Sequence, residues 1–205
     1  RDIKLGGSDY SGAFPVRLAP GGLIAGCVFT NLLNTKTSPA DGRWGGIYAT
    51  GGVISNTQFI ACNTWKAPVY ATGAKTLYVE DCSFTGVNST ERYKTPTCGA
   101  VYTKWGASGV QPVIMRRTTV ANNVLSVYAG AGAVIIETPS MSGNATFTDC
   151  VFTNNTASGD SGVFAINSNI GITCDRCVFA DNEGAKYGVF APVQYNVQIF
   201  RNCLF

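Results

Sequence analysis

A six-residue motif recurs along this chain and limits its fold more than any other feature of the sequence. The motif reads apolar, two variable residues, Cys or Thr, one variable residue and then Phe, or Val in one copy. Seven copies occupy residues 24–29, 54–59, 79–84, 115–120, 147–152, 174–179 and 200–205. Six steps separate Phe29 from Phe205, the final residues of the first and last copies, so the mean repeat is about 29 residues. Self-similarity at a period of roughly 20–50 residues is typical of solenoid proteins.

A second short motif lies between these copies and indicates a further strand in each repeat. It consists of small residues followed by apolar ones, at residues 45–48, 67–70, 99–102, 132–135, 162–164 and 188–190. Apolar residues alternate with other residues in both motifs, which favours strands over helices. Short strands at a long period predict an all-β, right-handed parallel β-helix of about seven coils. The main alternative is a β-sandwich, which requires hairpin pairs that the order of the motifs does not suggest.

The whole chain of 205 residues is predicted to form one domain. We expect residues 1–20 to be an N-terminal segment with an incomplete first coil and residues 21–205 to form the repeat coils. Hydrophobic residues make up 45% of the chain and charged residues 13%, whereas an ordinary globular domain has roughly 25% charged residues. This composition is sufficient for a large buried core.

Charge and residue types exclude several classes of function. The chain contains no histidine, which removes Ser-His-Asp and Cys-His nucleophile pairs and imidazole metal ligands. Its net charge of +3 is not concentrated in a run of Lys and Arg, so we expect no nucleic acid as a partner. No apolar stretch approaches the roughly 18 residues of a membrane span, so we expect no membrane insertion. We also expect no cofactor and no metal ion.

Two motifs together resemble those of a known repeat family. The first is Gly45-Gly46-Ile47-Tyr48, and the second occurs as Phe152-Thr-Asn-Asn155 and Phe179-Ala-Asp-Asn182. A Gly-Gly-apolar motif paired with Phe-x-x-Asn looks like the repeats of chlamydial polymorphic outer-membrane proteins and related β-helix adhesins. The resemblance covers most of residues 21–205 and implies a β-helix. It implies no catalytic residues, because such repeats occur on proteins with many roles.

Charged residues recur at one corner of the expected coil, immediately before the Cys or Thr of the six-residue motif. This position holds, copy by copy, Gly26, Asn56, Asp81, Arg117, Asp149, Arg176 and Asn202. One residue earlier, Glu80 is followed one coil later by Arg116, and Asp175 by Arg201. Opposite charges on adjacent strands stabilise the register, so we predict a structural ion ladder made of these eight charged residues. A binding site for acidic polysaccharide is the alternative.

Cysteine recurs at the inward position that follows this corner. Five copies have Cys27, Cys82, Cys150, Cys177 and Cys203 there, and two copies have Thr57 and Thr118. Cysteine packs as a small hydrophobic residue, which is the simplest reason for the pattern. A zinc site would need a second Cys pair of matching spacing. Two disulfides are candidates: Cys174 with Cys177 across a corner, and Cys62 with Cys98 between adjacent coils.

Other residues bear on location and ligands. The eight cysteines are an even number, as is typical of secreted proteins, and Asn88, Asn144 and Asn154 begin N-glycosylation sequons. We therefore expect a secreted or cell-surface protein. The carboxylates outside the ladder are scattered without a repeated spacing, which disfavours a polysaccharide lyase or hydrolase. Loops around Trp44 and Trp105 combine aromatic and charged residues and are candidates for a platform that binds glycans.

The last copy of the motif ends at an inward position. Phe200, Cys203 and Phe205 are expected to face an uncovered core, and residues 1–20 contain no amphipathic helix to close the other end. From Phe205 to Phe29 of a following chain is 29 residues, which equals the mean repeat. The two ends therefore match in phase.

These features predict a structural, non-enzymatic subunit of an extracellular fibre, whose partner is a second copy of itself stacked head to tail. Ala13 and Phe14 of the next chain would supply the missing strand at the junction, where Cys203 would lie near Cys27. Two alternatives stay open. The chain is a piece of a longer β-helix adhesin or carbohydrate-binding protein, or it is a polysaccharide lyase or hydrolase.

Overall fold

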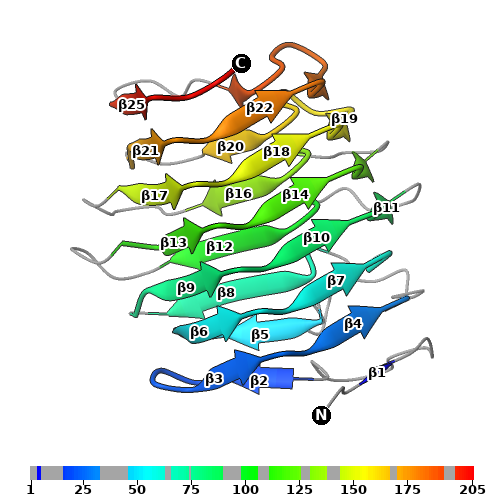
Figure 1. Ribbon diagram of the computed structural model, residues 1–205, viewed down its shortest axis with the longest axis vertical. Helices are drawn as coiled ribbons and strands as arrows, with labels where there is room; N and C mark the ends of the chain where they lie inside the picture. Colours follow the sequence, from blue (N-terminus) through cyan, green and yellow to red (C-terminus); the bar gives the residue numbers. More distant parts are fainter. Residues whose placement is uncertain are drawn as a thin grey trace.

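The described residues of the computed structural model form a parallel β-helix. They are residues 4–5, 16–32, 46–62, 66–73, 75–89, 98–105, 111–125, 130–137, 144–166, 170–191 and 197–205. Within them the chain forms strands β1 to β25 and no helix, and the strands stack in layers from the N-terminal end to the C-terminal end (Figure 1). The predicted all-β solenoid class is confirmed.

Three sheets of seven strands run along the solenoid, and we number them I, II and III. Sheet I contains β1 (Lys4–Leu5), β4 (Val28–Thr30), β7 (Gln58–Ile60), β10 (Ser83–Thr85), β14 (Thr119–Ala121), β18 (Val151–Thr153) and β22 (Val178–Ala180). Sheet II contains β2 (Val16–Leu18), β5 (Ile47–Ala49), β8 (Val69–Gly73), β12 (Val101–Trp105), β16 (Val134–Glu137), β20 (Phe164–Ile166) and β24 (Phe190–Ala191). Sheet III contains β3 (Leu23–Ala25), β6 (Gly52–Ser55), β9 (Leu77–Glu80), β13 (Val113–Arg116), β17 (Ala145–Thr148), β21 (Ile172–Asp175) and β25 (Gln198–Arg201).

Each coil crosses sheets II, III and I in that order. Four coils add a short strand to sheet IV, which contains β11 (Asn88–Ser89), β15 (Val124–Leu125), β19 (Thr156–Ala157) and β23 (Glu183–Gly184). The solenoid makes about five turns, fewer than the seven coils that we predicted.

The Phe of the six-residue motif forms the core of sheet I. Phe29, Phe59 and Phe84 are in register on adjacent strands. Their rings stack at centroid distances of 4.9 and 4.4 Å, with interplanar angles of 5° and 3°. Phe152 and Phe179 repeat this stack at 5.3 Å. The sequence repeat is therefore a repeat of ring stacking along the solenoid axis.

Two corners of each coil require a left-handed backbone. The corner from sheet III to sheet I has positive φ at Gly26, Asn56, Asp81, Arg117, Asp149, Arg176 and Asn202. The corner after sheet I has positive φ at Asn31, Ala61, Gly86, Asn122, Asn154 and Asp181. Gly, Asn and Asp reach this conformation at the least cost, which explains why they dominate both sets.

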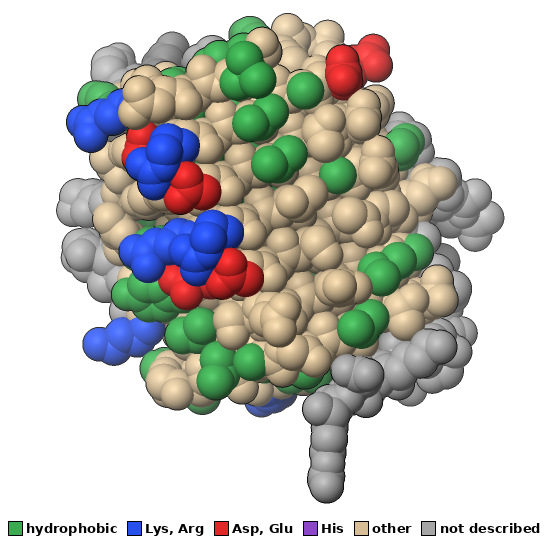
Figure 2. All heavy atoms as spheres, viewed as in Figure 1, with side chains coloured by type: hydrophobic (Ala, Val, Ile, Leu, Met, Phe, Trp, Pro, Cys, Tyr) green, Lys and Arg blue, Asp and Glu red, His purple; other side chains and the backbone are tan. Residues whose placement is uncertain are grey.

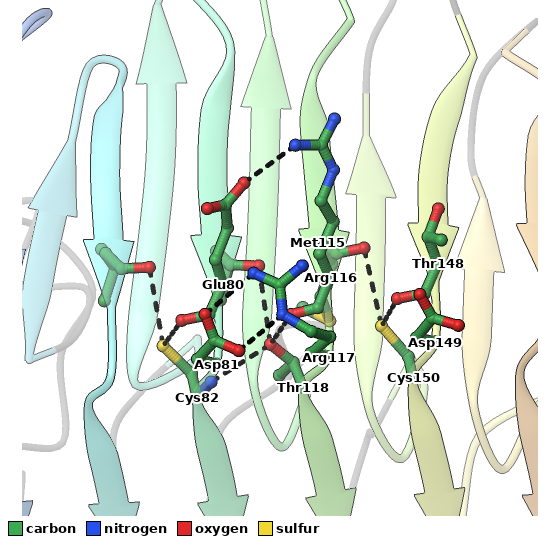
Figure 3. Close-up of polar contacts among 12 residues, drawn as sticks. Glu80, Asp81, Cys82, Met115, Arg116, Arg117, Thr118, Thr148, Asp149 and Cys150 are labelled. Atoms are coloured by element: carbon green, nitrogen blue, oxygen red, sulfur yellow. Dashed lines mark hydrogen bonds and ion pairs between the residues drawn. The ribbon is translucent and has the colours of Figure 1, made fainter.

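The Cys or Thr after the first corner braces the turn through a hydrogen bond. Thr118 Oγ1 donates to the carbonyl oxygen of Arg116 at 2.8 Å, and Cys82 Sγ donates to that of Glu80 at 3.1 Å (Figure 3). Cys150 Sγ makes the equivalent contact with Thr148 at 3.3 Å. Because a hydroxyl and a thiol both satisfy the same carbonyl group, Cys and Thr are interchangeable here.

The Phe-x-x-Asn motif and the glycine motif meet inside the later coils. Asn123 Nδ2 donates to Asn155 Oδ1, and Asn155 Nδ2 donates to Asn182 Oδ1, both at 2.9 Å. A Cβ atom at Gly99 would lie 2.8 Å from Asn123 Cβ, and one at Gly132 would lie 3.0 Å from Asn155 Cβ. The asparagine ladder thus packs where only glycine leaves room, which is the physical reason for the pairing of the two motifs.

Candidate functional site: the charged corner and the two end faces

The predicted ion ladder lies at the corner between sheets III and I. Arg117 forms a two-point ion pair with Asp81, at 2.6 and 2.9 Å, and Arg116 Nη1 is 3.1 Å from Glu80 Oε1 (Figure 3). Arg176 contacts Asp149 in the same two-point manner at 2.7 and 3.0 Å. In Figure 2, positive and negative side chains gather next to each other on the left of the face.

One predicted rung of the ladder is wrong. Asp175 and Arg201 are directly opposite in the register of β21 and β25, but they form no ion pair. Asp175 instead pairs with Arg176 of its own coil and accepts a hydrogen bond from Asn202 Nδ2 at 3.3 Å. The carboxylate therefore meets the corner residues rather than the Arg201 side chain.

Ion pairing shifts the titration of the corner groups. Hydrogen bonds from Arg117 and Arg176 lower the pKa of Asp81 and Asp149, respectively. The same contacts raise the pKa of the two guanidinium groups. All four groups are exposed, so water and salt screen their attraction. The ladder is thus suited to fixing register rather than to acid–base chemistry.

Replacing Asp149 with asparagine is expected to remove a pH-dependent part of the stability. The folded-state pKa of Asp149 is lowered, so its ion pairs contribute above about pH 4 and are lost as the pH falls through the folded-state pKa. Urea unfolding midpoints of the wild type and Asp149→Asn should therefore differ at pH 7 and converge in acid. Asp181→Asn is the control, since both residues have a φ of 54°. A wild-type–Asp149→Asn difference that is the same at all pH values would contradict the assignment.

Both predicted disulfides are wrong, because all eight cysteines are free. Cys62 lies inside the solenoid in the cluster that contains Phe29, whereas Cys98 packs with Tyr102 on the outer face of sheet II. Burial raises the pKa of the Cys62 thiol to about 11 and that of Cys98 to about 12. Both thiols are therefore protonated and unreactive at neutral pH.

The second cysteine pair belongs to a cluster of thiols. Cys177 Sγ donates to the carbonyl oxygens of Phe147 and Asp175 at 3.5 Å. The neighbouring Cys177 thiol, together with burial, raises the pKa of Cys150 and Cys174. The cluster is part of the apolar core. Within the described ranges, no three Cys, Asp or Glu side chains are placed to hold a metal ion.

A buried polar cluster on the outer face of sheet II was not predicted. Lys66 Nζ donates to Tyr102 Oη at 3.4 Å and lies 4.5 Å from the centre of its ring, while Tyr102 Oη donates to Glu137. Burial lowers the pKa of Lys66, and Glu137 opposes this effect. Lys66 and Glu137 lie outside both sequence motifs, so Tyr102 is the one residue of these three that belongs to a recognisable pattern. Because Tyr102 is fully buried, the cluster holds Lys66 against β12 rather than meeting a substrate.

The sequons and the proposed glycan platform are placed only in part. Asn88, Asn144 and Asn154 are all exposed, which leaves their side chains on the surface. Trp44 lies outside the described residues, and Trp105 is described only as the last residue of β12. The two loops are therefore not brought together by the described structure.

The C-terminal end face exposes core positions. Phe205 stacks on Phe179 at 5.2 Å, yet it is 68% exposed. Phe200 and Cys203, whose counterparts in the previous coil are buried, are half-exposed here. The series of inward residues thus continues to the end face without a cover among the described residues.

The N-terminal end face differs between the sheets. Val16, Ile24 and Cys27 are inward residues of the first coil and are only half-buried, whereas Phe29 is 2% exposed. Strand β1 pairs with β4 and aligns Leu5 with Phe29 in sheet I. In sheet II, Leu18 of β2 is also buried. Ala13 and Phe14, which we predicted for the junction, lie outside the described residues.

Comparison with protein-family models, curated proteins and solved structures finds no match for this chain. None of the helical segments needed to cross a membrane, long and strongly apolar, occurs in the described part of the chain. The architecture itself carries the classification. The protein is a single-domain parallel β-solenoid with an ion ladder along one corner and incompletely covered core positions at both end faces.

Proposed function

We propose that this protein is a non-enzymatic structural subunit of an extracellular fibre, in which solenoids stack head to tail. The observation that carries the proposal is the C-terminal end face. There, Phe205 is 68% exposed, although its counterparts in the two preceding coils, Phe179 and Phe152, are buried core residues. Covering Phe205 with one more coil would bury apolar surface and would pair strands of sheets I, II and III at this end.

The two end faces are compatible in register. Stacking a second copy by one repeat places Phe190 against Val16, Phe200 against Ile24 and Cys203 against Cys27 of the next copy, because each pair occupies one inward column of its sheet. These six residues are all half-buried in the single chain. A head-to-tail contact that does not close on itself generates a filament.

An extracellular setting accompanies this proposal. The exposed sequons at Asn88, Asn144 and Asn154 are accessible for glycosylation. The likeness of the glycine and Phe-x-x-Asn motifs to the repeats of chlamydial polymorphic outer-membrane proteins and β-helix adhesins also supports a surface location. The free thiols of Cys27 and Cys203 would then meet at each junction.

Electron microscopy and sedimentation of the purified 205-residue chain test the proposal. We expect filaments one solenoid wide, and we expect Phe205→Asp to raise the critical concentration roughly 30-fold or more, since it replaces about 2 kcal/mol of apolar burial with a buried charge. Ile60→Asp is the control, because Ile60 is a surface residue of β7 away from both ends and is 39% exposed. A wild type that remains monomeric at about 100 μM, or equal effects of the two variants, would overturn the proposal.

The formation of a disulfide between copies would test the register of the junction. Equivalent positions on adjacent coils are about 4.8 Å apart, which is within the Cα separation that a disulfide bridges. Oxidised glutathione would take the two electrons and two protons of Cys27 and Cys203 and leave as two reduced glutathione molecules. We expect Cys203→Ser to abolish the cross-linked ladder on a non-reducing gel and Cys62→Ser, at a buried thiol, to leave it intact.

A further inference from the structure

Among the described residues, β1 forms the last layer of sheet I at the N-terminal end. This strand pairs in parallel with β4 and aligns Lys4 with Val28 and Leu5 with Phe29. Leu5 precedes Phe29 by 24 residues, close to the 25 residues that separate Phe59 from Phe84. Strand β1 thus occupies the place of a motif Phe one repeat before the first copy.

At the C-terminal end of sheet I, the residues after β25 lie beside the last strand of the sheet, β22. Leu204 pairs with Val178 through an isolated bridge, in which Leu204 N donates to Cys177 O at 2.9 Å and Phe179 N donates to Leu204 O at 2.8 Å. The ring of Phe205 stacks on that of Phe179 with an interplanar angle of 18°. Leu204 therefore adds an isolated parallel bridge to sheet I beyond β22, and Phe205 follows it.

These two segments compete for one position when copies stack. In a head-to-tail stack Phe205 comes to lie against Phe29 of the next copy, where β1 of that copy already lies. We propose that the β4 edge of sheet I is a docking site for the Leu204–Phe205 segment of a second copy, and that β1 is a resident strand which this segment displaces. The inference rests on the proposed fibre and adds a step that would control its assembly, namely the displacement of β1.

Burial at the N-terminal end supports β1 as the competitor. Phe29 is 2% exposed, whereas Val16 in sheet II and Ile24 in sheet III are half-exposed. Leu18, the other inward residue of β2, is buried. Among the described residues, β1 in sheet I is the only strand that lies beyond the first coil at this end. An arriving end face brings β24 and β25 together with Phe205, so it replaces the short pairing of β1 with pairing in three sheets at once.

Deleting residues 1–5 tests this competition directly. A site that is free in only a fraction of molecules binds more weakly by that fraction. If β1 occupies the edge in nine molecules of ten, its removal should lower the critical concentration about tenfold and shorten the lag before filaments form. Leu5→Asp, which keeps the chain length, should act in the same direction, and Lys4→Gln is its control. The variants are compared at a temperature at which circular dichroism shows each to be folded.

Hydrogen exchange gives a second readout that does not depend on rates of assembly. In filaments, the amides of β4 should stay protected while those of β1 exchange as an unpaired segment. In monomers, both should be protected. A peptide of residues 1–8, added to the deletion variant, should restore the lag.

The outcomes separate the two proposals. Filaments of wild type and deletion variant with equal critical concentrations, and β1 still protected within them, would overturn the competition and leave the fibre intact. Folded wild type and deletion variant that both stay monomeric would overturn the fibre and with it this inference. Assembly of the deletion variant at a lower critical concentration than the wild type, abolished again by Phe205→Asp, would support both.

Discussion

Replacing Phe84 with alanine is expected to lower the free energy of unfolding by about 3–5 kcal/mol. The Phe84 side chain is fully buried, and its ring stacks on that of Phe59 at 4.4 Å. On the other side it faces Val120 of the next coil. Hydrogen bonds between the coils fix the distance between these neighbours, so the cavity left by the ring cannot collapse.

Equilibrium unfolding in urea at 25 °C measures this loss. Ile60→Ala is the matched control, because Ile60 follows Phe59 in β7 and is 39% exposed. Its replacement should change stability by less than about 1 kcal/mol. Equal losses in the two variants would show that Phe84 is not the interior member of the stack.

Replacing Gly132 with alanine should destabilise the solenoid by roughly 3 kcal/mol or more, at the upper end of the cost of overpacking. An added Cβ atom would lie 2.0 Å from the carbonyl oxygen of Gly162 in the next coil and 3.0 Å from Asn155 Cβ. Neither neighbour can turn away. The Gly162 carbonyl is backbone, and Asn155 is held by hydrogen bonds to Val120 O and Asn182 Oδ1 at 2.9 Å.

Gly188→Ala is the matched control for this variant. Gly188 belongs to the same column as Gly132 and Gly162 but lies in the last coil, where an added Cβ atom would meet only Asn182 O, at 3.0 Å. We expect a loss of less than about 1 kcal/mol in the thermal or urea unfolding of the monomer. In a filament, however, Gly188 would be covered by the next copy, so this variant should impair assembly while it leaves folding intact. A monomer destabilised as much by Gly188→Ala as by Gly132→Ala would contradict the close-approach explanation.

The fold could be predicted because successive copies of the sequence repeat form neighbouring strands of the same sheet. Phe29, Phe59 and Phe84 recur in sequence and are neighbours in space, so a pattern along the chain became a pattern along the axis. The corner position could be predicted as well. The ion pairs of Arg117 with Asp81 and of Arg176 with Asp149 follow from stacking the copies in register.

Other features depend on geometry that the repeat does not encode. The Cys62–Cys98 pairing failed because an inward and an outward residue of neighbouring segments lie on opposite faces of sheet II. The Asp175–Arg201 pair failed because exposed side chains choose among several partners, and Asp175 meets Arg176 and Asn202. Strand β1 was not predicted because two residues carry too little periodicity to be recognised as part of a copy.

The direction of the backbone hydrogen bonds has a mechanical consequence. All neighbouring strands are parallel and stacked along the axis, so the bonds between coils, such as Asp81 N to Arg116 O at 3.0 Å, point along that axis. Tension on the ends of a filament would therefore act along these bonds and load all the sheets of a coil interface together, whereas tension on a loose terminus would peel one coil at a time. The filament would therefore resist tension applied along its axis, whereas the same tension applied to one terminus would unfold it coil by coil.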